Sequence, residues 1–229
     1  MTTKKVDYRR SELAVHIPDT RGVHVSPWGR GNLKLGQGEG FYTYSKLPGL
    51  PSPHGGSCPG ATDTCLRVCY AFRVRETPLV WQMWEENTKQ GCLLPRLPRD
   101  AEIVRLHVAG DFDTKLYVTA WYLAAEVHPD VHFFGYTRSW RVPELLPELE
   151  KLRALPNVQL FASVDASDSK YDWPSRDWRW AWLGAPDAPP WWYADKPYRC
   201  PEEDGRKKSC EECNYCILGR RGDVVFQIH

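Results

Sequence analysis

The chain has 229 residues and a formal net charge of +1 at pH 7, with a sequence pI of about 7.6. A chain of this length buries roughly 70% of its unfolded surface, so it needs no disulfides in place of a hydrophobic core. The balanced charge excludes the strongly basic footprint of a nucleic-acid-binding protein. No run of residues has the length and hydropathy of a membrane span, so we expect no membrane partner.

The first ten residues, MTTKKVDYRR, lack the apolar core of a signal peptide. We therefore expect a protein of a reducing cytoplasm. In that compartment clustered cysteines are metal ligands rather than disulfides.

The N-terminal part leads into a cysteine-rich loop. Residues 1–36 are polar and weakly periodic, and we predict an arm lying over the domain. Residues 41–47 are rich in aromatic and β-forming side chains and predict the first strand. Cys58, Cys65 and Cys69 follow at the spacing C-x6-C-x3-C, in a loop rich in Gly and Pro. Iron–sulfur clusters and zinc prefer thiolate ligands, so this loop predicts a metal centre.

A regular alternation of helices and strands comes next. Thr77 and Pro78 predict the start of a helix that ends near Gly91. Apolar runs at 103–109, 131–136 and 158–164 predict three further strands, and His107 falls within the first of them as a core histidine. The helices between these strands are predicted from two apolar stripes, Leu116, Ala120, Trp121, Ala124 and Val127, then Leu145, Leu149 and Leu152.

This order predicts right-handed βαβ units in an α/β fold, built as a partial (β/α) barrel of parallel strands. We assign residues 37–165 to that barrel, together with the first cysteine loop. Residues 166–229 are expected to form an irregular lobe, rich in Trp and Cys, that ends in a closing strand at 224–228.

A second group of cysteines lies in this C-terminal segment. Cys200, Cys210, Cys213 and Cys216 have the spacing C-x9-C-x2-C-x2-C, whereas Cys92 lies apart from both groups. Four thiols at this spacing are typical of a structural zinc site or of a second iron–sulfur cluster. Residues 196–222 have few apolar side chains, so we expect metal binding to order them.

Polar residues follow the predicted strands at the edge where parallel α/β folds place their reacting groups. Asp111, Arg138 and Asp165 are the candidate catalytic residues. Arg138 is placed to pair with a carboxylate or a phosphate, and Asp113 is expected to cap the next helix.

Several separated motifs carry a family resemblance. CPGATDTCLRVCYA, RLHVAGDF, FFGYTRS, CPEEDG…SCEECNYC and the terminal VVFQIH occur in the order of the phage protein family called gene product 88. The resemblance implies a phage-encoded protein that acts in the cytoplasm of an infected bacterium.

The position of the cysteine loop is also distantly similar to that of radical SAM enzymes. Those enzymes hold a [4Fe-4S] cluster through three cysteines after the first strand and leave one iron open for S-adenosylmethionine. The similarity implies that Gly110, Asp111, Arg138 and Ser139 bind a cofactor. Radical SAM loops typically read C-x3-C-x2-C, so the longer spacing here favours cluster binding over S-adenosylmethionine binding.

Three functional hypotheses follow. The first is an iron–sulfur protein on a radical-SAM-like scaffold, with an electron donor or a host protein as its partner. The second is an active radical SAM enzyme. The third is a zinc-stabilised, non-enzymatic module that binds a host protein or a nucleic acid through the Trp-rich segment.

Overall fold

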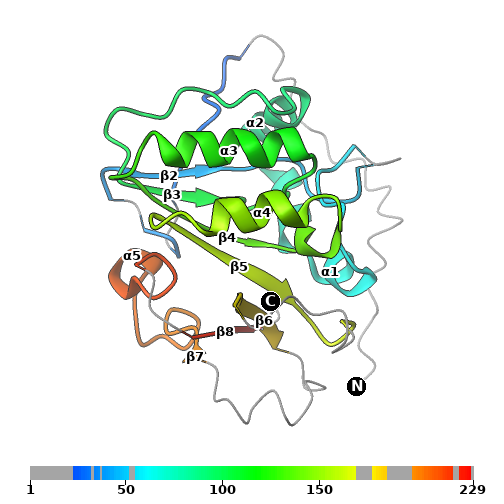
Figure 1. Cartoon of the computed structure of the whole chain (residues 1–229), viewed down its shortest axis with the longest axis vertical. Helices are drawn as coiled ribbons and strands as arrows, with labels where there is room; N and C mark the ends of the chain where they lie inside the picture. The colour runs from blue at the N-terminus through cyan, green and yellow to red at the C-terminus, as the bar shows by residue number, and fades with distance from the viewer. Residues whose placement is uncertain are drawn as a thin grey trace.

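The computed structural model describes residues 23–31, 34–36, 38–51, 55–168, 177–184, 198–218 and 222–227. Within these ranges one 8-stranded sheet has the order β1-β2-β3-β4-β5-β6-β8-β7 (Figure 1). The β1–β2 pair is antiparallel, and every other pair of neighbouring strands is parallel. The protein is therefore a mixed α/β fold with a mostly parallel sheet.

The strands are β1 (Gly29–Arg30), β2 (Phe41–Tyr44), β3 (Ile103–Leu106), β4 (His132–Thr137), β5 (Val158–Val164), β6 (Arg179–Gly184), β7 (Tyr198–Arg199) and β8 (Val224–Gln227). The α-helices are α1 (Asp63–Val68), α2 (Pro78–Lys89), α3 (Lys115–Glu126), α4 (Leu146–Arg153) and α5 (Cys210–Cys213). The described residues also contain the 3-10 helices η2 (Tyr70–Glu76) and η3 (Ser139–Arg141).

All five predicted strands are present, but the first ends at Tyr44 and the second at Leu106, so both are shorter than expected. β3 ends at Leu106 because His107 has a φ of 58°, in the left-handed region that strands exclude. The placement of His107 within a strand is therefore wrong.

The prediction of an irregular C-terminal lobe is wrong at β6, which continues the sheet between β5 and β8. Trp180, Ala181 and Trp182 in this strand are all buried. The sequence signal was the dense run of apolar residues from Trp178 to Leu183, which the surrounding Pro and Asp residues obscured. Residues 169–176 and 185–197 of this lobe, and residues 1–22 of the predicted arm, lie outside the described residues.

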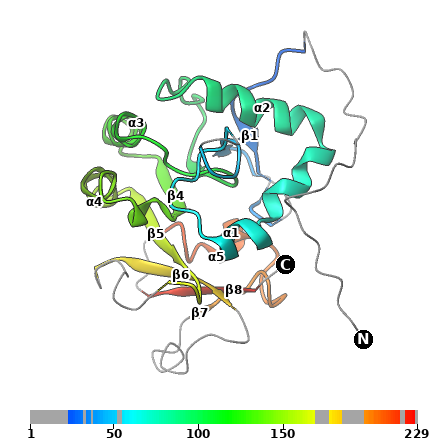
Figure 2. The same cartoon turned by 90° about the vertical axis from the view of Figure 1, so that its right-hand side faces the viewer.

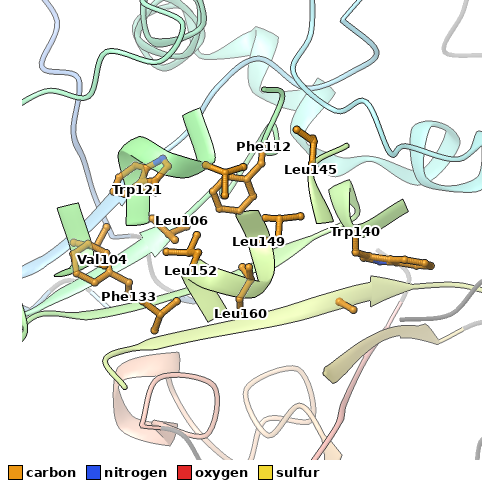
Figure 3. Close-up of a cluster of buried hydrophobic side chains, with 14 of the residues drawn as sticks. Val104, Leu106, Phe112, Trp121, Phe133, Trp140, Leu145, Leu149, Leu152 and Leu160 are labelled. Carbon is orange, nitrogen blue, oxygen red and sulfur yellow. The ribbon is translucent and has the colours of Figure 1, made fainter. Parts of the chain in front are cut away.

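Helices α3 and α4 lie side by side on one face of the sheet (Figures 1 and 2). Figure 3 shows the core beneath them, where Val104, Leu106, Phe133 and Leu160 of the sheet meet the helices. The predicted stripe of Leu145, Leu149 and Leu152 is confirmed, because all three are buried.

The stripe predicted for α3 is confirmed at Trp121, which is buried, and is wrong at its two ends. Leu116 and Val127 are 69% and 67% exposed, and the helix instead buries a face formed by Tyr117, Val118, Trp121 and Ala125. Two large aromatic rings contribute more apolar area than the predicted aliphatic residues, so they determine which face turns inward.

The opposite face of the sheet is covered by the C-terminal cysteine-rich segment. Phe41 and Phe134 pack with Cys210, Cys216 and Ile217 in one cluster there. Seen in Figure 2, the sheet curves from β1 towards β8, with α3 and α4 outside the curve. In the described ranges β1 and β7 each pair along one side only, so the sheet stays open. None of the described helices combines the length and apolar character needed to cross a membrane.

The orientation of the helices can be tested with two leucines. Leu149→Ala empties a fully buried position and should lower the free energy of unfolding by about 2–5 kcal/mol. Leu123→Ala is the matched control, because its side chain is 51% exposed and its loss should change stability by about 0.5 kcal/mol or less. Urea denaturation measures both, and similar losses in the two variants would contradict the assigned face of the helices.

Candidate metal centres

The first cysteine loop is fixed to the backbone that follows β2. The Ser57 amide donates to the Leu47 carbonyl at 3.0 Å, and the Cys58 amide donates to the Gly49 carbonyl at 2.9 Å. A Cβ at Gly60 would lie 2.1 Å from the Arg138 carbonyl oxygen. Only glycine therefore lets this loop lie against the carboxyl end of β4.

Thr62 joins the same loop to β5. Its hydroxyl oxygen accepts a hydrogen bond from the Cys65 amide at 3.1 Å and caps α1. The same hydroxyl donates to Asp165 Oδ2 at 3.1 Å. Cys65 lies in the first turns of α1 and Cys69 directly after it, so the cap fixes the backbone that carries both thiols.

The three thiols of this loop are neighbours whose ionisation is coupled. Burial raises the pKa of Cys58 well above its usual range, and the Asp111 carboxylate and the other two thiolates raise it further. Burial likewise raises the pKa of Cys65 to about 11, although the Arg138 guanidinium acts in the opposite direction. These thiols therefore stay protonated at neutral pH unless a bound cation takes the place of the proton.

The predicted cofactor-binding residues converge at the ends of β3 and β4. Asp111 Oδ1 accepts from the Thr137 hydroxyl at 2.6 Å, and its Oδ2 accepts from the Arg138 amide at 2.7 Å. Burial raises the pKa of Asp111 to about 6, and these hydrogen bonds oppose the rise. Gly110 has a φ of 78°, and a Cβ there would lie 2.5 Å from Ser57 Oγ. The Ser139 hydroxyl donates to the Phe112 carbonyl at 2.6 Å.

Arg138 pairs with carboxylates at the end of β5. Its Nη2 pairs with Asp165, and its Nη1 lies 3.0 Å from Asp168 Oδ2. Arg141, whose side chain is partly exposed, also pairs with Asp168, so two guanidinium groups and the two buried carboxylates form one network. Of the two partners considered for Arg138, a carboxylate and a phosphate, the structure has the carboxylate.

Asp113 does not cap α3, contrary to expectation. The N-cap is Thr114, whose hydroxyl accepts from the Tyr117 amide at 3.2 Å. Asp113 instead pairs with Lys46, a fully buried lysine whose ammonium also lies 4.2 Å from the centre of the Tyr117 ring. Sequence reasoning missed Lys46, for which the signal was a lysine directly after a buried strand.

His107 is held on the side of the sheet that α3 covers. Its Nε2 lies 2.8 Å from the Tyr117 hydroxyl, and its ring packs edge-on against Phe112 at 4.6 Å. Burial lowers the pKa of His107 well below its usual range, so the imidazole is neutral. The contacts of this ring are thus with core aromatic residues.

The four C-terminal cysteines line a single cavity of about 20 Å³, together with Tyr136, Tyr215, Val224 and Phe226 among other residues. Ser209 caps the short helix α5, and Asn214 ends it in the left-handed conformation. The Cys210 amide donates to the Lys34 carbonyl at 2.7 Å, so a segment near the N-terminus holds α5 in place. Burial raises the pKa of Cys210 to about 12 and that of Cys216 to about 11.

All eight cysteines lie in described residues, and all are free thiols. Within the described ranges, no three His, Cys, Asp or Glu side chains already stand in an arrangement that could hold a metal ion. Both groups nevertheless supply the donor type that zinc and iron–sulfur clusters take. Metal binding therefore requires the thiol groups to turn towards a common point.

These features define an α/β protein with two groups of free, mostly half-buried thiols, one at the carboxyl edge of the mostly parallel sheet and one on its face. A family model described as Gene product 88 matches residues 28–219. The chain belongs to the gene product 88 family.

Two relatives cover almost all of the chain. The Gene 88 protein of Mycobacterium phage L5 is 26% identical over 236 residues, which span 90% of this chain and 93% of the relative. The Gene 88 protein of Mycobacterium phage D29 is 27% identical over 237 residues, with the same two shares. No solved structure matches the chain.

The ion pairs of Arg138 at the strand ends should contribute strongly to the free energy of unfolding. Arg138→Met leaves two buried carboxylates without this partner and should lower the free energy of unfolding by about 3–5 kcal/mol. Lys151→Met is the control, because that lysine is 61% exposed in its pair with Glu148 and contributes about 0.5 kcal/mol. Equal urea midpoints for the two variants would show that the network is not stabilising.

Proposed function

We propose that this protein is a phage-encoded iron–sulfur protein that holds a [4Fe-4S] cluster through Cys58, Cys65 and Cys69. The observation that carries the proposal is a set of three neighbouring thiols on a loop anchored to the carboxyl ends of β2, β4 and β5. The phage origin of both relatives supports a role in the cytoplasm of an infected bacterium.

The fold supports a scaffold like that of radical SAM enzymes. Strands β2, β3, β4, β5 and β6 are parallel and follow one another in sheet order, and α3 and α4 cover one face. A partial (β/α) barrel has this arrangement. The cysteine loop follows the first of the parallel strands and Gly110 follows the second, as in those enzymes. Since no solved structure matches, this support comes from topology and sequence pattern alone.

A bound cluster would supply one-electron chemistry and, at an iron without a protein ligand, a site for a cofactor. Three thiolates leave the fourth iron to another ligand. His107 Nε2 is already engaged with Tyr117, which favours a C-terminal cysteine, water or a cofactor instead. Thr62, Asp111 and Arg138 contribute the contacts that hold the loop against the strand ends, and its thiols are partly shielded from water.

Metal analysis tests this proposal. Protein purified without oxygen should be brown and contain iron and acid-labile sulfide in similar amounts, because thiolates at this site select such clusters. Cys65→Ser should lose most of the iron and sulfide. Cys92→Ser is the matched control and should retain both, because Cys92 packs against the helix-covered core.

Zinc without sulfide in the wild-type protein, after cluster reconstitution has also been attempted, would contradict the cluster. That result would favour the third hypothesis, a zinc-stabilised module that binds a host protein.

An active radical SAM enzyme is the second candidate, and the position of the cysteine loop in the strand order favours it. Such an enzyme requires an open iron. Its EPR spectrum in the reduced state should shift when S-adenosylmethionine is added, and 5′-deoxyadenosine should form. An unchanged spectrum without this product would exclude the enzyme and leave a cluster whose fourth iron is capped by the protein.

A further inference from the structure

Arg105 is a buried cation for which the described residues offer no carboxylate partner. Its side chain extends from β3 on the face covered by the C-terminal segment, and the residue is 9% exposed. The Nε atom is buried without a hydrogen-bond partner, and Nη2 makes one long contact of 3.5 Å to the His107 carbonyl. The guanidinium lies over the Tyr136 ring at 4.0 Å and over the Phe134 ring at 5.1 Å.

A buried guanidinium without a counter-charge is costly, and contacts with aromatic rings offset only part of the lost hydration. Arg138, which follows the next strand along the chain, has two aspartates as counter-charges. Arg105 therefore needs a negative charge from another source.

The C-terminal group of thiols lies next to Arg105 and can supply this negative charge. Tyr136, which carries the Arg105 guanidinium on its ring, also lines the cavity formed by the four cysteines. The Tyr136 hydroxyl is hydrogen-bonded to Cys216. Phe134 packs in the same cluster as Cys210 and Cys216. The thiols and the guanidinium thus share two aromatic neighbours.

A second guanidinium, that of Arg179, contacts another residue of the cavity wall, Tyr215. Arg179 is stacked over the Phe161 ring at 4.1 Å, and its Nη2 donates to the Tyr215 carbonyl at 3.2 Å. Within the described residues its hydrogen-bond partners are neutral oxygens, and it forms no ion pair with a carboxylate there. Tyr215 also lines the cavity, so a cation stands behind each of two cavity walls.

We propose that Cys200, Cys210, Cys213 and Cys216 bind one divalent metal ion of the zinc type, and that Arg105 and Arg179 neutralise the tetrathiolate site. Four thiolates and one divalent cation leave a net charge of −2, which the two guanidinium groups balance. The cavity of about 20 Å³ admits one water-sized group, which suits a single ion rather than a four-iron cluster. This inference goes beyond the cluster proposed above, because it assigns all four C-terminal thiols to one ion and leaves none of them to cap the fourth iron of the first loop.

Cobalt titration of the full chain, stripped of metal by a chelator, tests this inference. Co²⁺ bound to thiolates gives intense charge-transfer absorption, and the part of the signal that Cys213→Ser abolishes reports the C-terminal site. Arg105→Met should weaken Co²⁺ and Zn²⁺ binding at this site by about 10–100-fold, the usual effect of removing an outer-shell partner. Arg105→Lys retains the charge and should recover most of the affinity.

Stability gives an independent signature. In the metal-free protein Arg105→Met removes an uncompensated buried charge, so the denaturant midpoint should stay the same or rise. In the zinc-loaded protein the same substitution should lower the midpoint. Arg153→Met is the matched control, because that guanidinium also lies over a ring, Trp178 at 5.1 Å, but pairs with Glu150. The change in denaturant midpoint that Arg153→Met causes should be the same with and without zinc.

The outcomes test metal binding at the C-terminal cavity separately from charge balance by the guanidinium groups. If the wild-type protein shows no Cys213-dependent cobalt or zinc binding, metal binding at this cavity fails, whereas iron at the first loop is measured separately. If the wild-type protein binds and Arg105→Met binds equally well, only the charge balance is overturned. Arg179→Met provides a second substitution at the same site should Arg105→Met fail to fold.

Discussion

The buried ion pairs between Arg138 and the two aspartates, Asp165 and Asp168, are the interaction on which the rest of the site depends. They join the carboxyl ends of β4 and β5, and the Arg138 amide extends the network to Asp111 after β3. Thr62 adds the cysteine loop through Asp165. Because removing one partner leaves an unpaired charge out of water, the network holds these four chain segments in one arrangement.

The two faces of the sheet have different chemistry. The face under α3 and α4 is an almost wholly apolar core, whereas the opposite face presents aromatic rings, the guanidinium groups of Arg105 and Arg179, and the C-terminal thiols. Hydrogen bonds from the backbone of α5 to Lys34 and Leu35 fasten this cysteine-rich segment across the sheet. Segments from both ends of the chain thereby cover a face that crossover helices leave open.

On the face of the sheet without crossover helices, the C-terminal thiols lie close to the guanidinium groups of Arg105 and Arg179. Burial raises the pKa values of Cys200, Cys210 and Cys216 and so keeps these thiols protonated when no metal is present, while Arg105 is buried without a carboxylate partner among the described residues. A bound metal ion that displaces the thiol protons would convert the thiols to thiolates, and these thiolates would supply the counter-charge that Arg105 lacks. This coupling gives a physical reason for a cysteine-rich segment with few apolar side chains to pack against the sheet.

The sequence alone determined the parallel α/β class, both groups of cysteines and the polar residues at the strand ends, because these depend on local periodicity and spacing. The ends of β3, the buried face of α3 and strand β6 were decided by tertiary packing. His107 takes a left-handed φ where its ring contacts Phe112 and Tyr117, and the rings of Tyr117 and Trp121 rather than the terminal residues of the predicted stripe orient α3. The partners of Lys46, Arg105 and Arg138 likewise lie on other elements of the fold, and burial alone sets the energy of such contacts.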